Sequence, residues 1–342
     1  MTAIVVIFTS VVVRAQSVSP GVRLDVSRLP ARPVALVQAG NSKAVCISTG
    51  SGTWKAGLRA AEQATGIDFR CLETFSDADP TWSQWMDPWI THANSGIPEW
   101  VAADRRQRTL IVSEDLIPQS LTNDPDPITW EQPCAAGQFN GYARRFARAL
   151  VSAGLGWSVI RLGKEANGGW EQDYVGQTSA EQHAWAQCFD QEVAAMRSVR
   201  GAHFLFDWNP NACTNALPLS NYYPGNAYVD IIGVDLYNAD CATQLPGPSA
   251  WSWHLLYTES YGLAQITAFA EKKGKPMSIP EWGLLASPNG LADDPYYVEG
   301  IATYVQNHDV AFQSYFDSGA NGVVQLGPST PKALAAYRHA FG

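Results

Sequence analysis

The chain of 342 residues has little of the side chains that several protein classes require. It contains only seven Lys and four Met, charged residues make up 16% of it, and its formal net charge is −9. Proteins that hold nucleic acid need a basic surface facing the phosphates, so this charge balance argues against a dedicated nucleic-acid binder. No apolar run reaches the length of about 20 residues that a membrane-spanning helix needs, so we expect no membrane span.

Motifs for metal, cofactor and serine-nucleophile chemistry are also missing. The six cysteines form no CxxC pair and no Cys/His cluster with zinc spacing. No nucleophile elbow supports Ser-His-Asp chemistry. Residues 50–52 (GSG) follow an apolar run, but they lack the third glycine of a dinucleotide-binding loop. We therefore expect no metal and no cofactor.

The N-terminus and the cysteines indicate the compartment. Residues 3–13 are an apolar run followed by a small-residue cleavage pattern at Ala15, which predicts a signal peptide over residues 1–15 without a positive n-region. A buried N-terminal strand is the alternative. An even number of cysteines favours disulfides in a secreted protein, with free thiols in the cytosol as the weaker interpretation. Among the pairings we favour the sequential one, Cys46–Cys71, Cys134–Cys188 and Cys213–Cys241.

Short apolar runs alternate with helical patterns along residues 16–342. The expected strands are 45–48, 68–72, 109–113, 158–162, 203–208, 229–234, 277–280 and 322–326. The expected helices are 53–65, 82–93, 137–153, 179–200, 257–273 and 298–318. Alternating β and α elements imply a parallel sheet, and eight such units without a linker predict a single (β/α)8 (TIM) barrel forming one catalytic domain. A doubly wound open sheet is the competing α/β fold.

Two glutamates interrupt the apolar ends of expected strands. Glu165 follows the fourth strand and Glu281 ends the seventh, each beside Gly and Trp. The carboxyl ends of barrel strands carry the active site, so both side chains are expected at one barrel mouth. Hydrolysis of a glycosidic bond needs two such carboxyl groups, one protonated and one ionised. Arg161 on the fourth strand is placed to keep one of them ionised, and Tyr237 to donate a hydrogen bond to it.

The pattern around these glutamates resembles glycoside hydrolase family 26, a family of clan A retaining β-glycosidases. Glu165-x-Asn167-Gly168-x-Trp170 is similar to its acid/base motif, and Pro280-Glu281-Trp282-Gly283 to its nucleophile strand. The resemblance continues through Trp208-x-Pro210-Asn211 and through residues 228–237, and covers about 140 to 285. It implies a retaining barrel enzyme that acts on β-linked polysaccharides, commonly β-mannan, with Glu165 as acid/base and Glu281 as nucleophile. The substrate-binding residues expected from both arguments are Arg161, Lys164, Asn167, Trp170, Trp208, Asn211, Asp235, Tyr237 and Trp282.

The chain also departs from that family pattern. Lys164 stands where the family has His before the acid, and the expected last strand at 323–326 lacks a Trp. Among the 13 Trp, the stripe Trp82, Trp85 and Trp89 has helical spacing typical of core. Trp130, Trp251 and Trp253 fall in expected loops, where stacking on sugar is more plausible.

These observations predict a secreted, retaining endo-β-glycosidase, a monomer that binds a polysaccharide or oligosaccharide. β-Mannan is the first candidate substrate. The alternatives are another clan A glycosidase acting on β-xylan, β-glucan or a bacterial cell-wall glycan, and a non-catalytic barrel that binds glycans through its Trp residues. Retention of both glutamates favours an enzyme, whereas Lys164 is the one feature that favours a binding protein.

Overall fold

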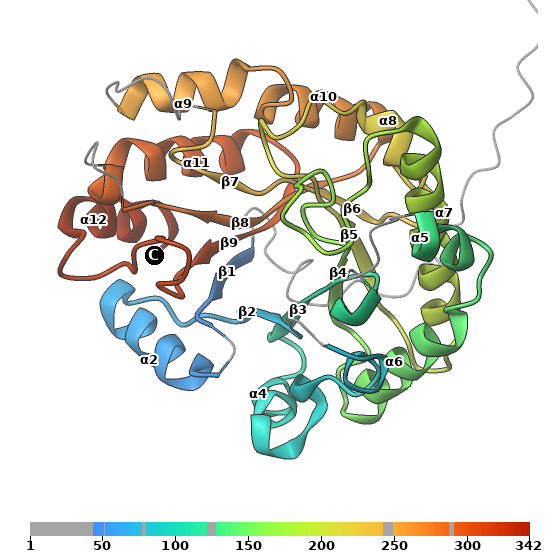
Figure 1. Cartoon of the computed structure of the whole chain (residues 1–342). Helices are drawn as coiled ribbons and strands as arrows, with labels where there is room; N and C mark the ends of the chain where they lie inside the picture. The colour runs from blue at the N-terminus through green and yellow to red at the C-terminus, as the bar shows by residue number, and fades with distance from the viewer. Residues whose placement is uncertain (1–43, 51, 77–79, 122–127, 242–248, 287–290) are drawn as a thin grey trace, which may run out of the picture. The chain divides into compact units, whose positions relative to one another are not determined.

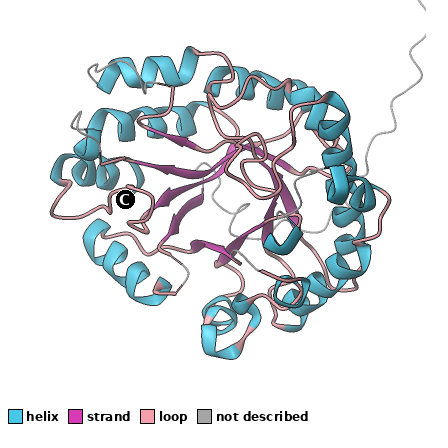
Figure 2. Cartoon of the chain, viewed as in Figure 1, coloured by secondary structure: helices cyan, strands magenta, loops and turns pink. Residues whose placement is uncertain are grey.

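A closed barrel of parallel strands forms the centre of the computed structural model, which describes residues 44–50, 52–76, 80–121, 128–241, 249–286 and 291–342 (Figures 1 and 2). The strands are β1 (Ala44–Ser48), β2 (Cys71–Phe75), β3 (Thr109–Glu114), β4 (Val159–Leu162), β5 (Leu205–Trp208), β6 (Ile231–Gly233), β7 (Leu236–Tyr237), β8 (Met277–Gly283) and β9 (Val310–Phe316). Each pairs in parallel with its neighbour. Pairing of β6 with β8 closes the ring, and the two-residue β7 extends the β6 position, so the barrel has eight strand positions. The predicted (β/α)8 fold is confirmed.

Helices surround this barrel, as Figure 2 shows. They are α2 (Trp54–Thr65), α3 (Trp82–Trp85), α4 (Ile97–Ala103), α5 (Ile128–Ala135), α6 (Asn140–Ser152), α7 (Ser179–Arg197), α8 (Leu219–Tyr222), α9 (Ser249–Thr258), α10 (Leu263–Lys273), α11 (Pro295–Asn307) and α12 (Pro331–Phe341), with short 3-10 turns η2 (Trp89–Thr91), η3 (Ala93–Ser95), η4 (Gln119–Leu121) and η5 (Leu291–Asp293). The longest, α7, begins with a capping box between Thr178 and Glu181. No helix in the described ranges is long and apolar enough to cross a membrane.

The inside of the barrel changes from apolar to polar along the strands. Near their amino ends, a cluster of buried side chains comprises Cys46, Cys71, Ile111, Val159, Ile231 and Phe312. Side chains alternate between the two faces of a strand, so the residues two positions further also point inward. Those residues are buried and mostly polar: Ser48, Glu73, Ser113, Arg161 and Ser314, with Asp207 and Ser278 on β5 and β8. The polar layer lies directly below the carboxyl-end loops.

The last strand is where the sequence-based prediction was wrong. The helix expected over 298–318 ends at Asn307, and residues 310–316 form β9 between β1 and β8. His308 adopts an extended backbone and interrupts the helix, and the following VAFQSYF segment is rich in the aromatic side chains that pack well in strands. Residues 322–326, expected as the eighth strand, contribute only an isolated bridge between Val323 and Leu285.

Two helical predictions also needed correction. The helix expected over 82–93 is the short α3 followed by η2 and η3, and the helix expected over 257–273 is divided into α9 and α10. Gly262, which separates α9 from α10, has no room for a side chain, because a Cβ there would lie 2.6 Å from the Leu256 carbonyl oxygen.

All three predicted disulfides are present: Cys46–Cys71, Cys134–Cys188 and Cys213–Cys241. The first lies inside the barrel between paired residues of β1 and β2, and the second joins α5 to α7. The third joins the segment after β5 to the segment after β7 at the carboxyl end of the barrel. The signal peptide predicted at residues 1–15 lies outside the described residues.

Candidate active site

Glu165 lies on a sharp turn that follows β4. Gly163 has φ 60°, and a Cβ at this position would lie 2.6 Å from the ring of Trp185, so a larger residue does not fit. Glu165 itself has φ 46°, in the left-handed region that non-glycine residues rarely occupy. Its backbone N–H donates to the Asn209 carbonyl at 3.0 Å. Such strained residues cluster at functional sites, where the surrounding structure holds them in place.

Two donors hold the Glu165 carboxyl group. Asn211 Nδ2 donates to Oε1 at 2.6 Å, and Trp170 Nε1 donates to Oε2 at 2.7 Å. Burial raises the pKa of Glu165, and the negative charge of Glu281 raises it further; Arg161 and the two hydrogen bonds only partly oppose this. A carboxyl group with a raised pKa keeps its proton closer to neutrality, which is what a general acid requires.

Glu281 has a different set of partners. Arg161 Nη1 donates to its Oε1 at 2.5 Å and the Tyr237 hydroxyl donates to its Oε2 at 2.8 Å. The Glu281 backbone N–H donates to Asp235 Oδ1 at 3.0 Å, which fixes the end of β8 against the segment before β7. A guanidinium and a phenol thus occupy both oxygens of this carboxyl group and fix its orientation.

Arg161 is the centre of a buried charge network. Its side chain is fully buried, and besides Glu281 it contacts Glu73 at 3.1 Å, Asn209 at 2.8 Å and Asp235. Burial alone would lower the pKa of Arg161, but Asp235, Glu281 and Glu73 raise it well above its ordinary value. Burial raises the pKa of Glu73 to about 7 despite the contact with Arg161. Arg161 therefore remains charged. The carboxyl groups around it titrate together, because the negative charge of one disfavours ionisation of its neighbours.

Lys164, which directly precedes Glu165, forms ion pairs with two acidic side chains. Its Nζ lies 2.5 Å from Asp115 Oδ1 and 2.9 Å from Glu171 Oε2. Burial would lower the pKa of Lys164, but Asp115, Glu171 and Asp173 raise it well above the usual value. Oxygens of these three acids lie within 4.8 Å of one another, a spacing that a metal ion can also use. In this chain the ammonium group already neutralises part of that charge.

The structure brings together most of the predicted site residues. Asn167 is buried, and it fixes Asn211 by accepting from its backbone N–H at 2.8 Å and donating to its carbonyl oxygen at 2.9 Å. Trp170 is 60% exposed beside Glu165, where it is available to a ligand. Arg161 and Asp235 are fully buried, so they act on the glutamates and do not contact a ligand directly.

Several aromatic residues lie elsewhere than the sequence suggested. Trp208 and Trp282 are 1% and 0% exposed, and both pack in the layer between barrel and helices, where no sugar can stack on them. Trp130, expected in a loop, is buried in α5. Trp253 belongs to α9 and packs on Tyr297, and Trp251 is also in α9. Trp85 is core, as its helical spacing indicated.

Glu73, Asn209 and Asp115 are parts of the site that sequence reasoning missed. Glu73 follows the apolar run expected at 68–72, although it is the middle residue of β2, and Asp115 directly follows β3. Asn209 follows β5 in the same way. Position at a strand end was therefore a usable signal, but it did not show that Arg161 would join Glu73 and Asn209 to Glu281.

Comparison with known proteins agrees with this geometry. The family model for glycosyl hydrolase family 26 matches residues 156–277, which include Glu165 and Tyr237 and end before Glu281. Among solved structures, the Bacillus subtilis mannanase BCman is similar with 17% identity, 88% of each chain covered and a TM-score of 0.62. A Cellulomonas fimi endo-β-1,4-mannanase is similar with 15% identity, 90% of this chain and 73% of that chain covered and a TM-score of 0.61. The family 26 β-mannanase BoMan26A of Bacteroides ovatus has 15% identity, 90% and 92% coverage and a TM-score of 0.59.

The segment 156–277 thus matches a glycosyl hydrolase family 26 domain, and the barrel is the fold of the solved mannanases named above. The low identities show that this chain is divergent from those structures. The resemblance read from the sequence is confirmed.

Proposed function

We propose that this protein is a secreted, retaining endo-β-glycosidase in which Glu165 is the acid/base and Glu281 the nucleophile. The observation that carries the proposal is the contrast between the two carboxyl groups. Arg161 and Tyr237 each donate to one oxygen of Glu281, whereas Glu165 accepts from two neutral side chains and burial raises its pKa. One ionised and one protonated carboxyl group are the pair that glycosidic hydrolysis requires.

In the first step, Glu281 attacks the anomeric carbon while Glu165 gives its proton to the departing glycosidic oxygen. The product of this step is a covalent glycosyl-enzyme with an α-linked ester. In the second step Glu165, now ionised, removes a proton from water as the water attacks the anomeric carbon and releases Glu281. Two inversions give net retention of the β configuration, and we expect the carboxyl groups about 5–5.5 Å apart, as in retaining enzymes.

The neighbouring groups have defined parts in this sequence. Tyr237 orients Glu281 and remains protonated, because burial and then the charge of Glu281 raise its pKa well above the usual value. Asn211 holds one oxygen of Glu165. Trp170 is the exposed aromatic surface on which a sugar ring at the acid/base side stacks.

β-Mannan is the first substrate to test, because the similar structures named above are mannanases. β-Xylan, β-glucan and bacterial cell-wall glycans are the further candidates, since Lys164 changes the contacts beside the acid. Three disulfides support function outside the cytosol.

Glu165→Ala tests the acid/base assignment. We expect hydrolysis of polysaccharide to fall by roughly 10²–10⁴-fold, and hydrolysis of an aryl β-glycoside with an activated leaving group to fall far less in its first step. The physical reason is that an activated phenolate departs without protonation. Initial rates on both substrates provide the measurement, with Glu171→Gln as a nearby control that is not expected to discriminate between them. Equal losses on both substrates would contradict the assignment.

Glu281→Ala tests the nucleophile. We expect turnover to be abolished, because no covalent intermediate forms. Azide then attacks from the vacated face and yields an α-glycosyl azide from an activated β-glycoside. For the unmodified enzyme, NMR of early products should show the β anomer before mutarotation. Early α product would overturn the assignment of Glu281 as nucleophile and make it a base that activates water.

A further inference from the structure

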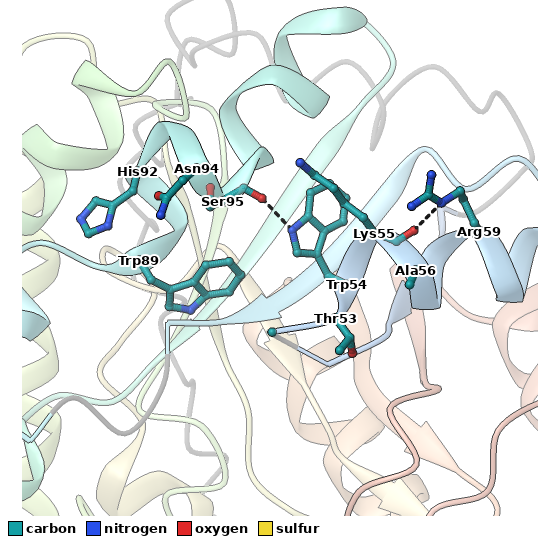
Figure 3. Close-up of a pocket in the computed structure, with 10 residues that line it drawn as sticks. Thr53, Trp54, Lys55, Ala56, Arg59, Trp89, His92, Asn94 and Ser95 are labelled. Atoms are coloured by element: carbon teal, nitrogen blue, oxygen red, sulfur yellow. Dashed lines mark hydrogen bonds between the residues drawn. The ribbon is translucent and has the colours of Figure 1, made fainter.

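A cavity of about 530 Å³ lies beside the barrel mouth, at the start of α2 and along η2 and η3 (Figure 3). Strand β1 ends at Ser48 and α2 begins at Trp54, while η2 and η3 belong to the segment that follows β2. The cavity is therefore built from the carboxyl-end segments after β1 and β2. Glu165 and Glu281 lie at this same end of the barrel, but neither lines the cavity.

Two fixed indole rings line this cavity. Trp54 Nε1 donates to the Ser95 carbonyl at 3.0 Å, and Trp89 Nε1 donates to the Phe75 carbonyl at 3.0 Å. Both polar atoms are thus satisfied within the protein, and the rings are held in place. Trp89 is only half-buried, so part of its apolar surface is left for a ligand, which is how sugar rings are commonly held.

The charged side chains at this cavity are all basic. Figure 3 draws the Lys55 side chain across the Trp54 ring with Arg59 beyond it, and His92 and Asn94 on the side of Trp89. His92 is 3.2 Å from Asp87, so it has a carboxylate partner. Within the ranges that the structure describes, neither Lys55 nor Arg59 has a carboxylate at ion-pair distance.

The two cations are also held by the cavity wall. Lys55 Nζ lies 5.5 Å from the centre of the Trp54 ring, within the range of a cation–π contact. Arg59 Nε donates to the Lys55 carbonyl at 3.1 Å, which leaves the rest of the guanidinium group available. Both side chains are one helical turn apart on α2 and exposed, and an anion placed between them gains from both charges.

Direct contacts connect this cavity to the glutamates. The Phe75 carbonyl accepts from Trp89, and the Phe75 ring lies 5.9 Å from the guanidinium carbon of Arg161. Arg161 in turn binds Glu281. Trp89 thus lies beside the carboxyl end of β2, at the same end of the barrel as Glu281.

We propose that this cavity is an outer subsite for an acidic sugar residue, whose ring packs on Trp89 and whose carboxylate lies between Lys55 and Arg59. The proposal rests on the glycosidase function above and narrows its substrate class to β-linked polysaccharides that carry uronic acids or carboxylate substituents. In this proposal neutral sugar residues of the polysaccharide occupy the cleavage site, and its acidic residue determines the position at which the polysaccharide binds.

The test compares two ligands that differ only in charge. A β-linked oligosaccharide with one glucuronic acid residue and its carboxyl-reduced, neutral counterpart are titrated calorimetrically into the Glu281→Ala protein. We expect the acidic ligand to bind about fivefold more tightly at low salt, since each exposed charge pair contributes modestly. High salt should remove most of this difference.

Charge-matched variants separate the cavity from the overall field of the protein. Lys55→Gln/Arg59→Gln should abolish the preference, whereas Arg106→Gln/Lys272→Gln, which changes the net charge equally at exposed positions before β3 and β8, should retain it. Equal binding of both ligands, or equal loss of preference in both double variants, would overturn the proposal. Turnover is not needed for this readout, so residual hydrolysis by Glu281→Ala would contradict the catalytic assignment and leave the binding comparison intact.

Discussion

The hydrogen bond from Trp170 to Glu165 joins the most exposed aromatic residue of the site to the proposed acid/base. Trp170 is 60% exposed, yet its indole N–H donates to Oε2 at 2.7 Å. An indole only donates, so this bond favours the ionised form of Glu165 and lowers its pKa against the raising effect of burial.

Trp170→Phe retains an aromatic ring and removes the donor. We expect the pKa of Glu165 to rise, because a contact that lowers it is lost, and the alkaline limb of the kcat/KM profile to move to higher pH. Trp157→Phe is the matched control, since Trp157 is also exposed but precedes β4 at the opposite end of the barrel. An unchanged alkaline limb in Trp170→Phe would show that the tryptophan acts through stacking alone.

At the scale of single residues, the sequence was informative where a charge interrupted an apolar run. Glu165 and Glu281 became candidates in this way, and the Tyr237 hydroxyl donates to Glu281 as expected. Burial was harder to predict, because exposure depends on which helix covers a strand. Trp208 and Trp282 lie at strand ends, where a ligand-binding tryptophan would also be expected. Their rings nevertheless point outward into the helical layer.

Among the elements, the segment after β5 has the most direct effect on the acid. Asn211 in this segment holds Glu165, Thr214 Oγ1 donates to Asn211 Oδ1 at 2.6 Å, and Cys213 ties the segment to Cys241 after β7. The Cys213–Cys241 bond thus helps to keep the Asn211 amide aligned with the Glu165 carboxyl group. We expect removal of this bond to lower activity in addition to stability.

Replacing Cys213 and Cys241 together by Ser tests this dependence. We expect loss of about 3 kcal/mol of stability, or roughly 6 °C in Tm, together with a clear fall in kcat. Replacing Cys134 and Cys188 by Ala should lower Tm by a similar amount and leave kcat unchanged, because that bond joins α5 to α7 away from the site. Tm from thermal unfolding and kcat from steady-state kinetics are compared for the two variants. A similar kcat loss in both would indicate a general loss of order.

Prediction of the elements succeeded where strands were short, apolar and followed by a polar residue. It failed at β9, because VAFQSYF is aromatic on both faces and follows an apolar helix without a glycine or proline between them. Tertiary pairing with β1 and β8 determines that it is a strand. The sequential cysteine pairing was predicted correctly. Each of the three bonds joins two segments that follow each other closely along the barrel.

Across the whole molecule, many buried carboxyl groups have raised pKa values. Burial raises the pKa of Asp207 and Asp317 to about 7 and that of Glu131 to about 8. A raised pKa means that the folded state holds protons which the unfolded chain releases near its ordinary pKa of about 4. This stabilisation is complete below that value and is lost as the pH rises through 7 to 8.

We therefore expect Tm to fall steadily between pH 5 and pH 8, measured by thermal unfolding in buffers of equal ionic strength. Glu131→Gln should flatten this slope, because the neutral amide cannot ionise within the contact between α5 and α7. Glu99→Gln is the control, since Glu99 is exposed in α4 and its substitution should leave the slope unchanged. A Tm that rises from pH 5 to pH 8 would show that ion pairs such as that of Arg197 with Asp230 dominate the balance.

The three disulfides differ in how a thiol reductant can reach them. Cys46 and Cys71 are enclosed by the barrel, and Cys134 and Cys188 are fully covered, whereas Cys213 and Cys241 are partly exposed at the mouth. Thiolate exchange requires direct approach to a sulfur atom. We therefore expect a mild reductant to open the Cys213–Cys241 bond first, while the folded barrel protects the other two. Activity should then be lost before the protein unfolds and return when that one accessible pair is reoxidised.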